Sequence, residues 1–338
     1  MRYRTLGRSG IEVSEFALGA LNFGLPGTRD ESAATQLIRR ALDSGINLID
    51  TADVYGLGDS ERAVGRAIKG RRDDVVVATK FGLPMGKDVN CSGGSARWIR
   101  RAVEDSLRRL DTDHIDLYQL HRPDYATDLD ETLGALTDLV RAGKVRLIGT
   151  STFPAEWIVE AQWVAQRGGH RRFRTEQPRY SIVNRTPESH VFPTAQRHGM
   201  GVLTYGSLAS GWLSGRANPA EGARAAIDAR TFDLSSPGNQ AKLAAVAELQ
   251  KLAGSAGISL SHLALAFARA HPAVSTVLIG PRTPAQLDAL LDGVDVTLSE
   301  DVLDRIDAIV PPGSELNIDD NYRADPPALI DASLRRRR

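Results

Sequence analysis

Four polar side chains are of the types needed to deliver a proton to an oxygen atom. Asp50 ends the apolar stretch NLID, and Tyr55 follows it five residues later. Lys80 ends VVVATK, and His121 ends IDLYQLH. A free tyrosine has a pKa of about 10, so it is a poor acid at neutral pH unless a nearby cation stabilises the phenolate. We expect Lys80 to be that cation and Asp50 to keep the buried ammonium charged.

The remaining member of the set, His121, can donate a hydrogen bond to a carbonyl oxygen and direct it toward the Tyr55 hydroxyl. No activated serine or cysteine nucleophile belongs to the set. The sequence has no H-x-x-H or C-x-x-C spacing, so we expect no metal. Such an acid neutralises negative charge that develops on an oxygen atom, and transfer of a hydride to a carbonyl group produces that charge. Because proteins have no hydride donor of their own, we expect a nicotinamide cofactor to supply the hydride.

These residues must be positioned by regular elements, and the sequence alternates between two kinds. Short runs rich in valine, isoleucine and leucine are typical of parallel strands that are buried on both faces. They occur at residues 16–18, 47–49, 75–79, 115–120, 145–148, 173–176, 201–204 and 276–279. Between them lie segments with helical periodicity. One is DESAATQLIRRALDSG, which has Asp30 as an N-cap and Gly45 as a stop.

This β-α order favours a (β/α)8 TIM barrel. The competing fold is a doubly wound sheet, which normally has a G-x-G-x-x-G turn after its first strand. Here GALNFGLPG follows instead. We predict one domain over 1–338, with an N-terminal β-hairpin at 2–13, the barrel at about 15–290 and a C-terminal helix and tail at about 298–338. Two long polar loops, 82–96 and 214–240, follow strands and would lie on the C-terminal face.

Nearly every predicted strand ends in a polar residue. The C-terminal ends of barrel strands share one face, where active sites of this fold lie, so we expect these residues to converge. In chain order they are Asp50, Lys80, His121, Ser151, Gln177, Tyr205, and Gly280 with Arg282.

The overall composition excludes several classes of protein. With 42 basic and 42 acidic residues, the chain has no general reason to bind nucleic acid or an acidic membrane surface. One cysteine, Cys91, allows no internal disulfide and fits a cytoplasmic protein. No apolar run is long enough to span a membrane. The basic run at 335–338 is most simply a solvated tail, and the oligomeric state stays open.

The same segments resemble the aldo-keto reductase family. The resemblance rests on GINLIDTADVYGLGDSE, VVVATKFG, DSLRRLDTDHIDLYQLHRPD, GKVRLIGTST, EQPRYSIVNR, GMGVLTYGSLASGWLSG and VLIGPRTPAQL, which occur in the family's order. It implies a TIM barrel that reduces small aldehydes or ketones with NADPH, or with NADH. It also implies that Tyr55 is the general acid, that Lys80 and Asp50 tune it, and that His121 orients the substrate.

The resemblance also assigns the cofactor site. Ser151 with Thr152, and Gln177, would bind the nicotinamide carboxamide, and Tyr205 would stack under the ring. The pyrophosphate would lie on the loop formed by Gly206, Ser207, Leu208, Gly211 and Leu213. The adenosine end would meet Gly280, Arg282 and Gln286, with Arg282 on a 2′-phosphate.

Three departures from the family pattern bear on the cofactor. Thr152 and the pair Gly206-Ser207 replace the usual asparagine and Ser-Pro. Ala289 and Leu290 replace the usual Glu-Asn adenine contacts, so the preference for NADPH over NADH depends mainly on Arg282.

The substrate stays open in the sequence. We expect the substrate pocket to use Phe23, Trp98, Phe153 and the two long loops. Some similar bacterial proteins reduce keto-sugar nucleotides in antibiotic pathways, and others act on general aldehydes, free sugars or pyridoxal. A different class of function is a cofactor-binding regulatory subunit of a potassium channel, because QPRYSIVNR is close to the motif of that branch.

Overall fold

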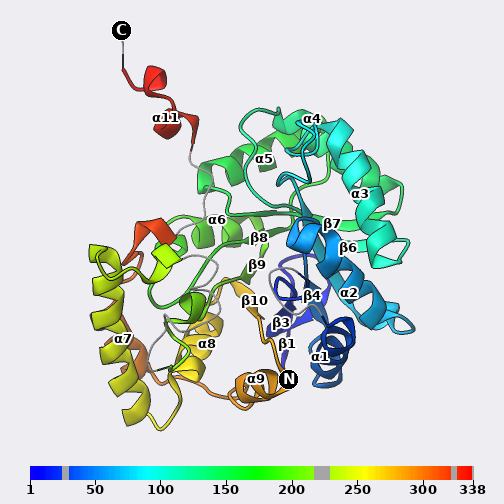
Figure 1. Ribbon diagram of the computed structural model, residues 1–338. Helices are drawn as coiled ribbons and strands as arrows, with labels where there is room; N and C mark the ends of the chain where they lie inside the picture. The colour runs from blue at the N-terminus through cyan, green and yellow to red at the C-terminus, as the bar shows by residue number, and fades with distance from the viewer. Residues whose placement is uncertain (25–29, 217–228, 321–325, 337–338) are drawn as a thin grey trace.

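Eight parallel strands close into a barrel that is surrounded by helices (Figure 1). The computed structural model describes residues 1–24, 30–216, 229–320 and 326–336. The strands follow one another around the ring in chain order, and the last pairs with the first. They are β3 (Phe16–Gly19), β4 (Leu48–Asp50), β5 (Val76–Phe81), β6 (Ile115–Leu120), β7 (Val145–Ser151), β8 (Thr175–Gln177), β9 (Gly201–Thr204) and β10 (Val274–Ile279). The predicted (β/α)8 TIM barrel is confirmed, and the doubly wound sheet is excluded.

The helices begin and end largely where the sequence signals indicate. In α1 (Glu31–Asp43), Asp30 caps the N-terminus by accepting hydrogen bonds from the backbone of Ser32 and Ala33. The other helices of the ring are α2 (Asp59–Ile68), α3 (Ala96–Leu110), α4 (Leu129–Arg141), α5 (Ala155–Gly168), α6 (Val191–His198), α8 (Leu260–Ala270) and α9 (Pro284–Leu291). Two further helices, α7 (Pro237–Ser255) and α10 (Glu300–Ile309), pack on each other.

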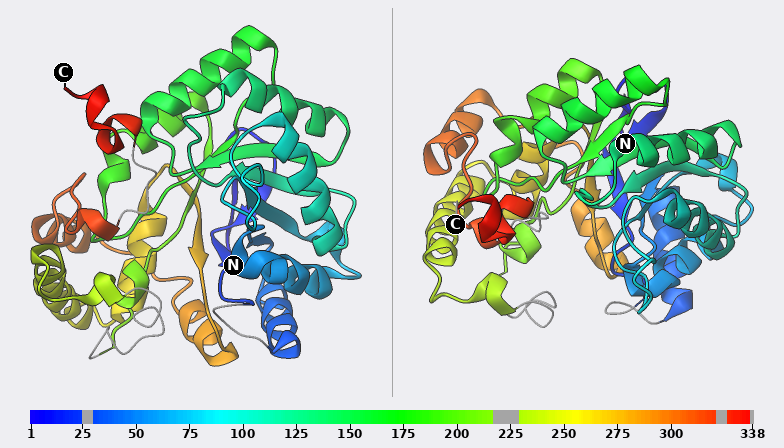
Figure 2. Two further views of the ribbon diagram at one scale, coloured as in Figure 1. Left: turned by 45° about the horizontal axis from the view of Figure 1, so that its top comes forward. Right: turned by 90° about the horizontal axis from the view of Figure 1, so that it is seen from above.

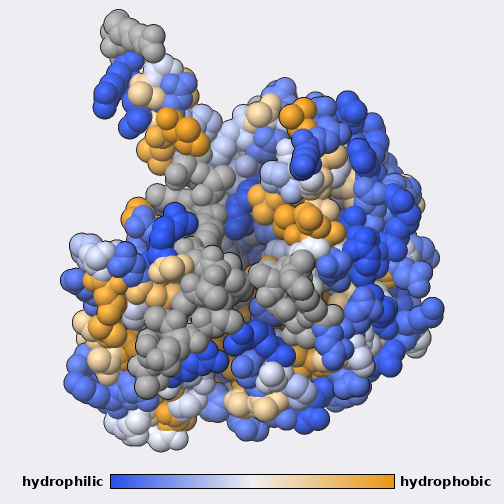
Figure 3. All heavy atoms as spheres, viewed as in Figure 1, coloured by the Kyte–Doolittle hydropathy of each residue, from blue (hydrophilic) through white to orange (hydrophobic). Residues whose placement is uncertain are grey.

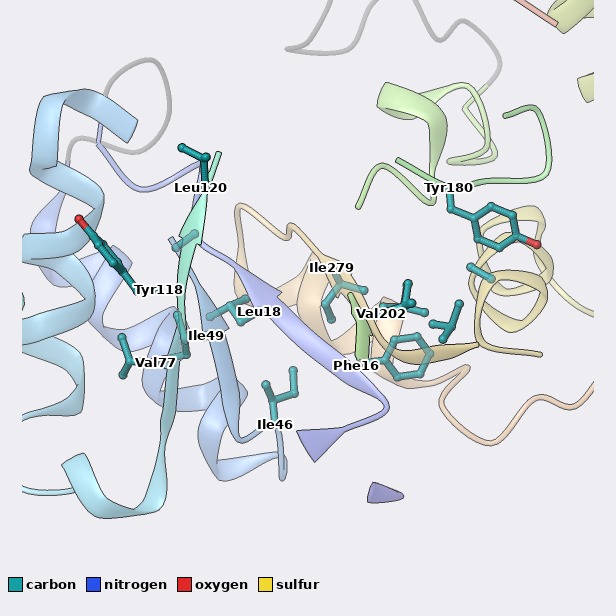
Figure 4. Packing of buried hydrophobic residues seen from close by; sticks show 14 of the residues in the cluster. Phe16, Leu18, Ile46, Ile49, Val77, Tyr118, Leu120, Tyr180, Val202 and Ile279 are labelled. Atoms are coloured by element: carbon teal, nitrogen blue, oxygen red, sulfur yellow. The ribbon is translucent and has the colours of Figure 1, made fainter. Parts of the chain in front are cut away.

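The strands divide their side chains between two apolar clusters. Leu18, Ile49 and Val77 lie on neighbouring strands and belong to the large cluster between barrel and helices (Figure 4). Ala17 and Leu48, each one residue earlier in its strand, belong to the small cluster inside the barrel. This alternation follows from the pleat of a strand, in which successive side chains point to opposite faces.

The predicted N-terminal hairpin is confirmed as β1 (Tyr3–Thr5) and β2 (Glu12–Ser14), which pair antiparallel. Leu6 and Val13 are fully buried and join the cluster inside the barrel. At Gly7 the backbone has φ 56°, and a Cβ atom would lie 2.3 Å from the backbone nitrogen of Gly201. Only glycine therefore allows the hairpin to approach β9 this closely.

The outer surface of the helices is largely polar, as the right side of Figure 3 shows. At the C-terminal end of the described chain, α11 (Pro327–Ile330) protrudes from the helical ring in Figure 1 and at the edge of the left view of Figure 2. No helix among the described residues is both long and apolar enough to cross a membrane.

Candidate active site

The alternation of side chains along the strands brings the predicted polar residues together. Leu48 and Ala78 point into the barrel. Two residues further along the same strands, Asp50 and Lys80 therefore point to the same side, at the C-terminal end of the ring. Both are almost completely buried. The strands thus place a carboxylate and an ammonium side by side under the mouth of the barrel.

The ammonium of Lys80 is the centre of the site. Its Nζ donates to Asp50 Oδ2 at 2.5 Å and to the carbonyl oxygen of Thr51 at 2.9 Å, and it lies 3.4 Å from the Tyr55 hydroxyl. Burial alone would lower the pKa of Lys80, but Asp50 and Tyr55 outweigh burial and raise it. Lys80 therefore carries its charge directly beside the tyrosine oxygen.

The other carboxylate oxygen of Asp50 is held by two amides. Gln119 Nε2 donates to Oδ1 at 3.1 Å, and Gln177 Nε2 donates to it at 2.9 Å. With Lys80 on Oδ2, both oxygens of the buried carboxylate are hydrogen-bonded. These hydrogen bonds offset the free-energy cost of burying the Asp50 carboxylate away from water.

The ring of His121 meets the ring of Tyr55 edge to face, with centroids 5.7 Å apart. Burial, followed by the positive charges of Lys80 and Arg122, lowers the pKa of His121 well below its ordinary value. His121 is therefore neutral at physiological pH. A neutral imidazole carries one N–H group, which can donate to a carbonyl oxygen near the tyrosine.

A tight turn presents Tyr55 to the mouth. Residues Tyr55–Gly58 form a 3₁₀ turn in which Gly56, Leu57 and Gly58 all have positive φ. At Gly58, with φ 98°, a Cβ atom would lie 2.3 Å from Cδ of Arg109. The turn reverses the chain within a few residues and leads directly into α2, which leaves the Tyr55 ring over the barrel.

A cavity of about 670 Å³ opens at this end of the barrel, and Asp50, Tyr55 and His121 line it. Its volume is in the ordinary range for small-molecule sites. All but two of the predicted cofactor residues line it as well, namely Ser151, Gln177, Tyr205, Gly206, Ser207, Leu208, Gly211, Gly280, Arg282 and Gln286. Among the described residues, no His, Cys, Asp and Glu side chains are grouped as a metal site requires.

Several of these residues offer polar atoms that fit a nicotinamide cofactor. The hydroxyls of Ser207 and Tyr205 are buried without a hydrogen-bond partner in the described part of the chain. Such atoms are costly unless a ligand satisfies them. The side-chain amide nitrogen of Gln177 donates to Asp50. The side-chain carbonyl oxygen of Gln177 therefore remains to accept a hydrogen bond from the carboxamide of a nicotinamide. Arg282 is half-buried, and its backbone nitrogen donates to the side chain of Gln286 at 2.9 Å.

Six predicted site residues do not line this cavity, and one of them is the catalytic candidate Lys80, which is 1% exposed. Thr152 has φ 54° and donates its hydroxyl to the carbonyl oxygen of Ser151, and Leu213 is fully buried. Phe23, Trp98 and Phe153, the predicted pocket aromatics, are buried at 0%, 4% and 1% exposure and belong to the large apolar cluster. The second long loop, 214–240, lies partly outside the described residues.

Sequence reasoning missed several residues that shape the site. Gln119 donates to Asp50, and it lies in β6, two residues before His121, which directly follows that strand. The period of two that placed His121 inside the barrel could have found it. Arg122, Arg179 and Arg216 line the cavity. Asn22, which follows β3, donates its side-chain nitrogen to the carbonyl oxygen of Gly280 at 2.9 Å. These positions lie in loops, where no periodicity marks the direction of a side chain.

Comparison with known proteins agrees with this geometry. The model of the Aldo/keto reductase family matches residues 15–311. The uncharacterized oxidoreductase YrpG of Bacillus subtilis is 38% identical, over 93% of this chain and 98% of its own length. The aldo-keto reductase YhdN of Bacillus subtilis is 39% identical, over 90% and 92%. A probable voltage-gated potassium channel subunit beta of Oryza sativa is 36% identical, over 92% and 97%.

Proposed function

The chain belongs to the aldo/keto reductase family, a family of oxidoreductases, and we propose that it reduces a small aldehyde or ketone to an alcohol with NADPH, using Tyr55 as the general acid. The observation that carries this proposal is the contact of one buried ammonium, that of Lys80, with both Asp50 and the Tyr55 hydroxyl at the cavity wall.

Each side chain has a defined task in this proposal. A bound nicotinamide supplies a hydride to the carbonyl carbon, which leaves negative charge on the carbonyl oxygen. Tyr55 donates its hydroxyl proton to that oxygen, and Lys80 stabilises the phenolate that remains. Asp50 fixes Lys80 and keeps it charged. Neutral His121 donates a hydrogen bond that holds the carbonyl oxygen against the tyrosine.

Residues around the mouth are suited to hold the cofactor. Ser151 and the carbonyl oxygen of Gln177 would meet the carboxamide, and Tyr205 would stack on the nicotinamide ring. The Gly206–Gly211 loop would receive the pyrophosphate, and Arg282 would bind a 2′-phosphate. With Ala289 and Leu290 as apolar neighbours, Arg282 is the residue on which the choice of NADPH over NADH depends.

The experiment that tests the acid is Tyr55→Phe, which removes one oxygen and keeps the ring. We expect kcat/KM for aldehyde reduction to fall about 10²- to 10⁴-fold, while the Kd for NADPH changes less than about twofold. Fluorescence titration gives the Kd, and NADPH absorbance gives the rate. Wild-type turnover in this variant would refute the role of Tyr55.

The cofactor assignment has its own test in Arg282→Ala. We expect NADPH affinity to fall about 10-fold or more and NADH affinity to fall less than about twofold, because only NADPH carries the 2′-phosphate. Fluorescence titration with each cofactor measures both values. Equal losses for the two would remove the phosphate role from Arg282.

A second candidate function is a cofactor-binding regulatory subunit, which the name of the Oryza sativa relative favours. The two candidates differ in one result. Binding of NADPH without turnover of any aldehyde or ketone in a broad panel would support the regulatory subunit, whereas turnover that depends on Tyr55 would support the reductase.

A further inference from the structure

A short segment that follows α10 packs on the start of α7. It consists of residues 314–320, which we call the strap. Asn317 of the strap is buried and donates its side-chain nitrogen to Oδ1 of Asn239 in α7 at 2.8 Å. A Cβ atom at Gly238 would lie 2.7 Å from Cγ of Asn317, so the two segments approach closely. These contacts place Asp320, the last residue of the strap, beside α7.

The carboxylate of Asp320 joins two buried cations. Its Oδ2 accepts a hydrogen bond from Nζ of Lys242 at 2.6 Å and lies 3.8 Å from Nη2 of Arg179. The side chains of Lys242, Arg179 and Asp320 are 0%, 3% and 7% exposed. Burial lowers the pKa of Lys242, and Asp320 acts against that shift. One carboxylate therefore links α7, the segment after β8 and the strap.

The contact with Arg179 leads to the cavity. Arg179 lines the cavity, whereas Asp320 and Lys242 do not. The backbone of Arg179 forms a parallel bridge with Tyr205. At the next residue, Gly206, φ is 72° and a Cβ atom would lie 3.3 Å from Cγ of Arg179. The side chain of Arg179 thus lies against the first residue of the loop that would receive the pyrophosphate.

The contact with Lys242 leads to the other end of the same loop. Nζ of Lys242 lies 4.9 Å from the ring centroid of Trp212, which directly follows Gly211 and is 2% exposed. The indole nitrogen of Trp212 donates to the carbonyl oxygen of Thr231 at 3.1 Å, and Nζ of Lys242 lies 3.4 Å from that same oxygen. Asp320 is therefore connected, through its two cations, to both ends of the loop.

We infer that Asp320 is a positioning residue for the cofactor, which fixes the Gly206–Gly211 loop through Arg179 and Lys242 in the shape that receives the pyrophosphate. The inference rests on the proposed binding of NADPH and adds a residue that does not line the cavity. Because NADPH and NADH share the pyrophosphate, loss of the Asp320 carboxylate should weaken both cofactors equally. Loss of Arg282, in contrast, should act through the 2′-phosphate and weaken NADPH alone.

The test is Asp320→Asn in the full chain, with NADPH and NADH titrated separately by calorimetry. We expect both Kd values to rise about 10-fold and their ratio to change less than about twofold. The dissociation rate of NADPH, followed by stopped-flow fluorescence, should rise by a similar factor, because loss of a contact mainly speeds release. Asp320→Glu keeps the charge and should bind both cofactors more tightly than Asp320→Asn does.

Asp319→Asn is the matched control, because Asp319 is the exposed neighbour of Asp320 in the strap. It removes the same formal charge and should change either Kd less than about twofold. Three results would overturn the inference. They are wild-type affinities in folded Asp320→Asn, a loss of affinity for one cofactor alone, and equal losses in the two variants.

A double variant, Lys242→Met with Asp320→Asn, removes both members of the pair and carries the test if Asp320→Asn alone does not fold. We expect it to raise both Kd values about 10-fold as well. Because the two residues act through one contact, this rise should be smaller than the product of the rises in the two single variants. Wild-type affinities in the folded double variant would overturn the inference.

Binding and turnover together separate this inference from the proposed function. Wild-type binding of NADPH that is unchanged in Asp320→Asn would overturn the inference alone. Binding that depends on Asp320, without reduction of any aldehyde or ketone, would overturn the reductase and support the inference. Failure of the wild type to bind either cofactor would overturn both.

Discussion

Two buried ion pairs lie on opposite faces of the same strand, and only one reaches the cavity. On β5, Lys80 points into the barrel and pairs with Asp50. The preceding residue, Thr79, points outward and donates to Glu61 at 2.6 Å. Glu61 in α2 is fully buried and pairs with Arg109 of α3 at 2.6 Å.

The two pairs have nearly equal distances, and each has a buried carboxylate, so the difference that matters is what lies beside them. The inner pair has the hydroxyl of Tyr55 within 3.4 Å of its cation and one carboxylate at the cavity wall. The outer pair joins two helices to a strand, and neither partner lines the cavity. Burial of an ion pair is therefore a poor sign of catalysis by itself, whereas contact with a titratable group at a cavity is a better one.

The largest expected effect that separates the pairs is that of Lys80→Met. Without the ammonium, a phenolate at Tyr55 loses its stabilising charge, and we expect kcat/KM to fall about 10³-fold or more. The measurement is NADPH-dependent aldehyde reduction by protein whose folding has been checked by circular dichroism. Activity near that of the wild type in folded protein would show that the inner pair is structural like the outer one.

The next effect belongs to the outer pair. Arg109→Met leaves the buried Glu61 without its cation, and we expect unfolding free energy to fall by about 3–5 kcal/mol. Urea unfolding measures this, and kcat per folded molecule should stay within about threefold of wild type. The control is Arg108→Met, an exposed neighbour in the same helix, for which we expect a change of less than about 0.5 kcal/mol. A loss of kcat as large as that of Lys80→Met would abolish the distinction.

The effect that is smallest over a single pH unit concerns Asp53, a fully buried carboxyl near Glu61 and Arg109. Burial, followed by the charge of Glu61, raises the pKa of Asp53 to about 8. A raised carboxyl pKa stabilises the fold below the unfolded value of about 4 and loses that contribution as pH rises toward 8. Asp53→Asn stays neutral, so its stability relative to wild type should rise between pH 5 and 8, by at most about 1.4 kcal/mol per pH unit. Urea unfolding at several pH values measures the difference. A difference that does not change with pH would contradict a protonated Asp53.

Most of the fold could be predicted because barrel strands are buried on both faces and read as short apolar runs. The weakest prediction was β8, expected at 173–176 and found at Thr175–Gln177, since its sequence TEQ is polar. Its Gln177 is needed at the mouth, where it donates to Asp50, and its Glu176, on the opposite face of the strand, accepts a hydrogen bond from Thr150. An apolar pattern cannot reveal a strand whose residues serve the site.

Site residues on strands could be predicted more completely than those in loops. The period of two along a strand determines the direction of Asp50, Lys80 and His121. No such period applies to Phe23 or Phe153, and an aromatic side chain in a loop can equally well face a cavity or fill the core. The structure buries both in the core, because packing against other apolar side chains removes more apolar surface from water.

The pairing of β10 with β3 has a consequence for how the chain is made. Residues 277–279 pair with residues 16–18, so the barrel cannot close on the ribosome until almost the whole chain has emerged. Until then, β3 presents an unpaired edge that can bind another strand. Synthesis that stalls before β10 should therefore yield an aggregation-prone fragment, and slower translation of the first half should bring no gain in folded yield.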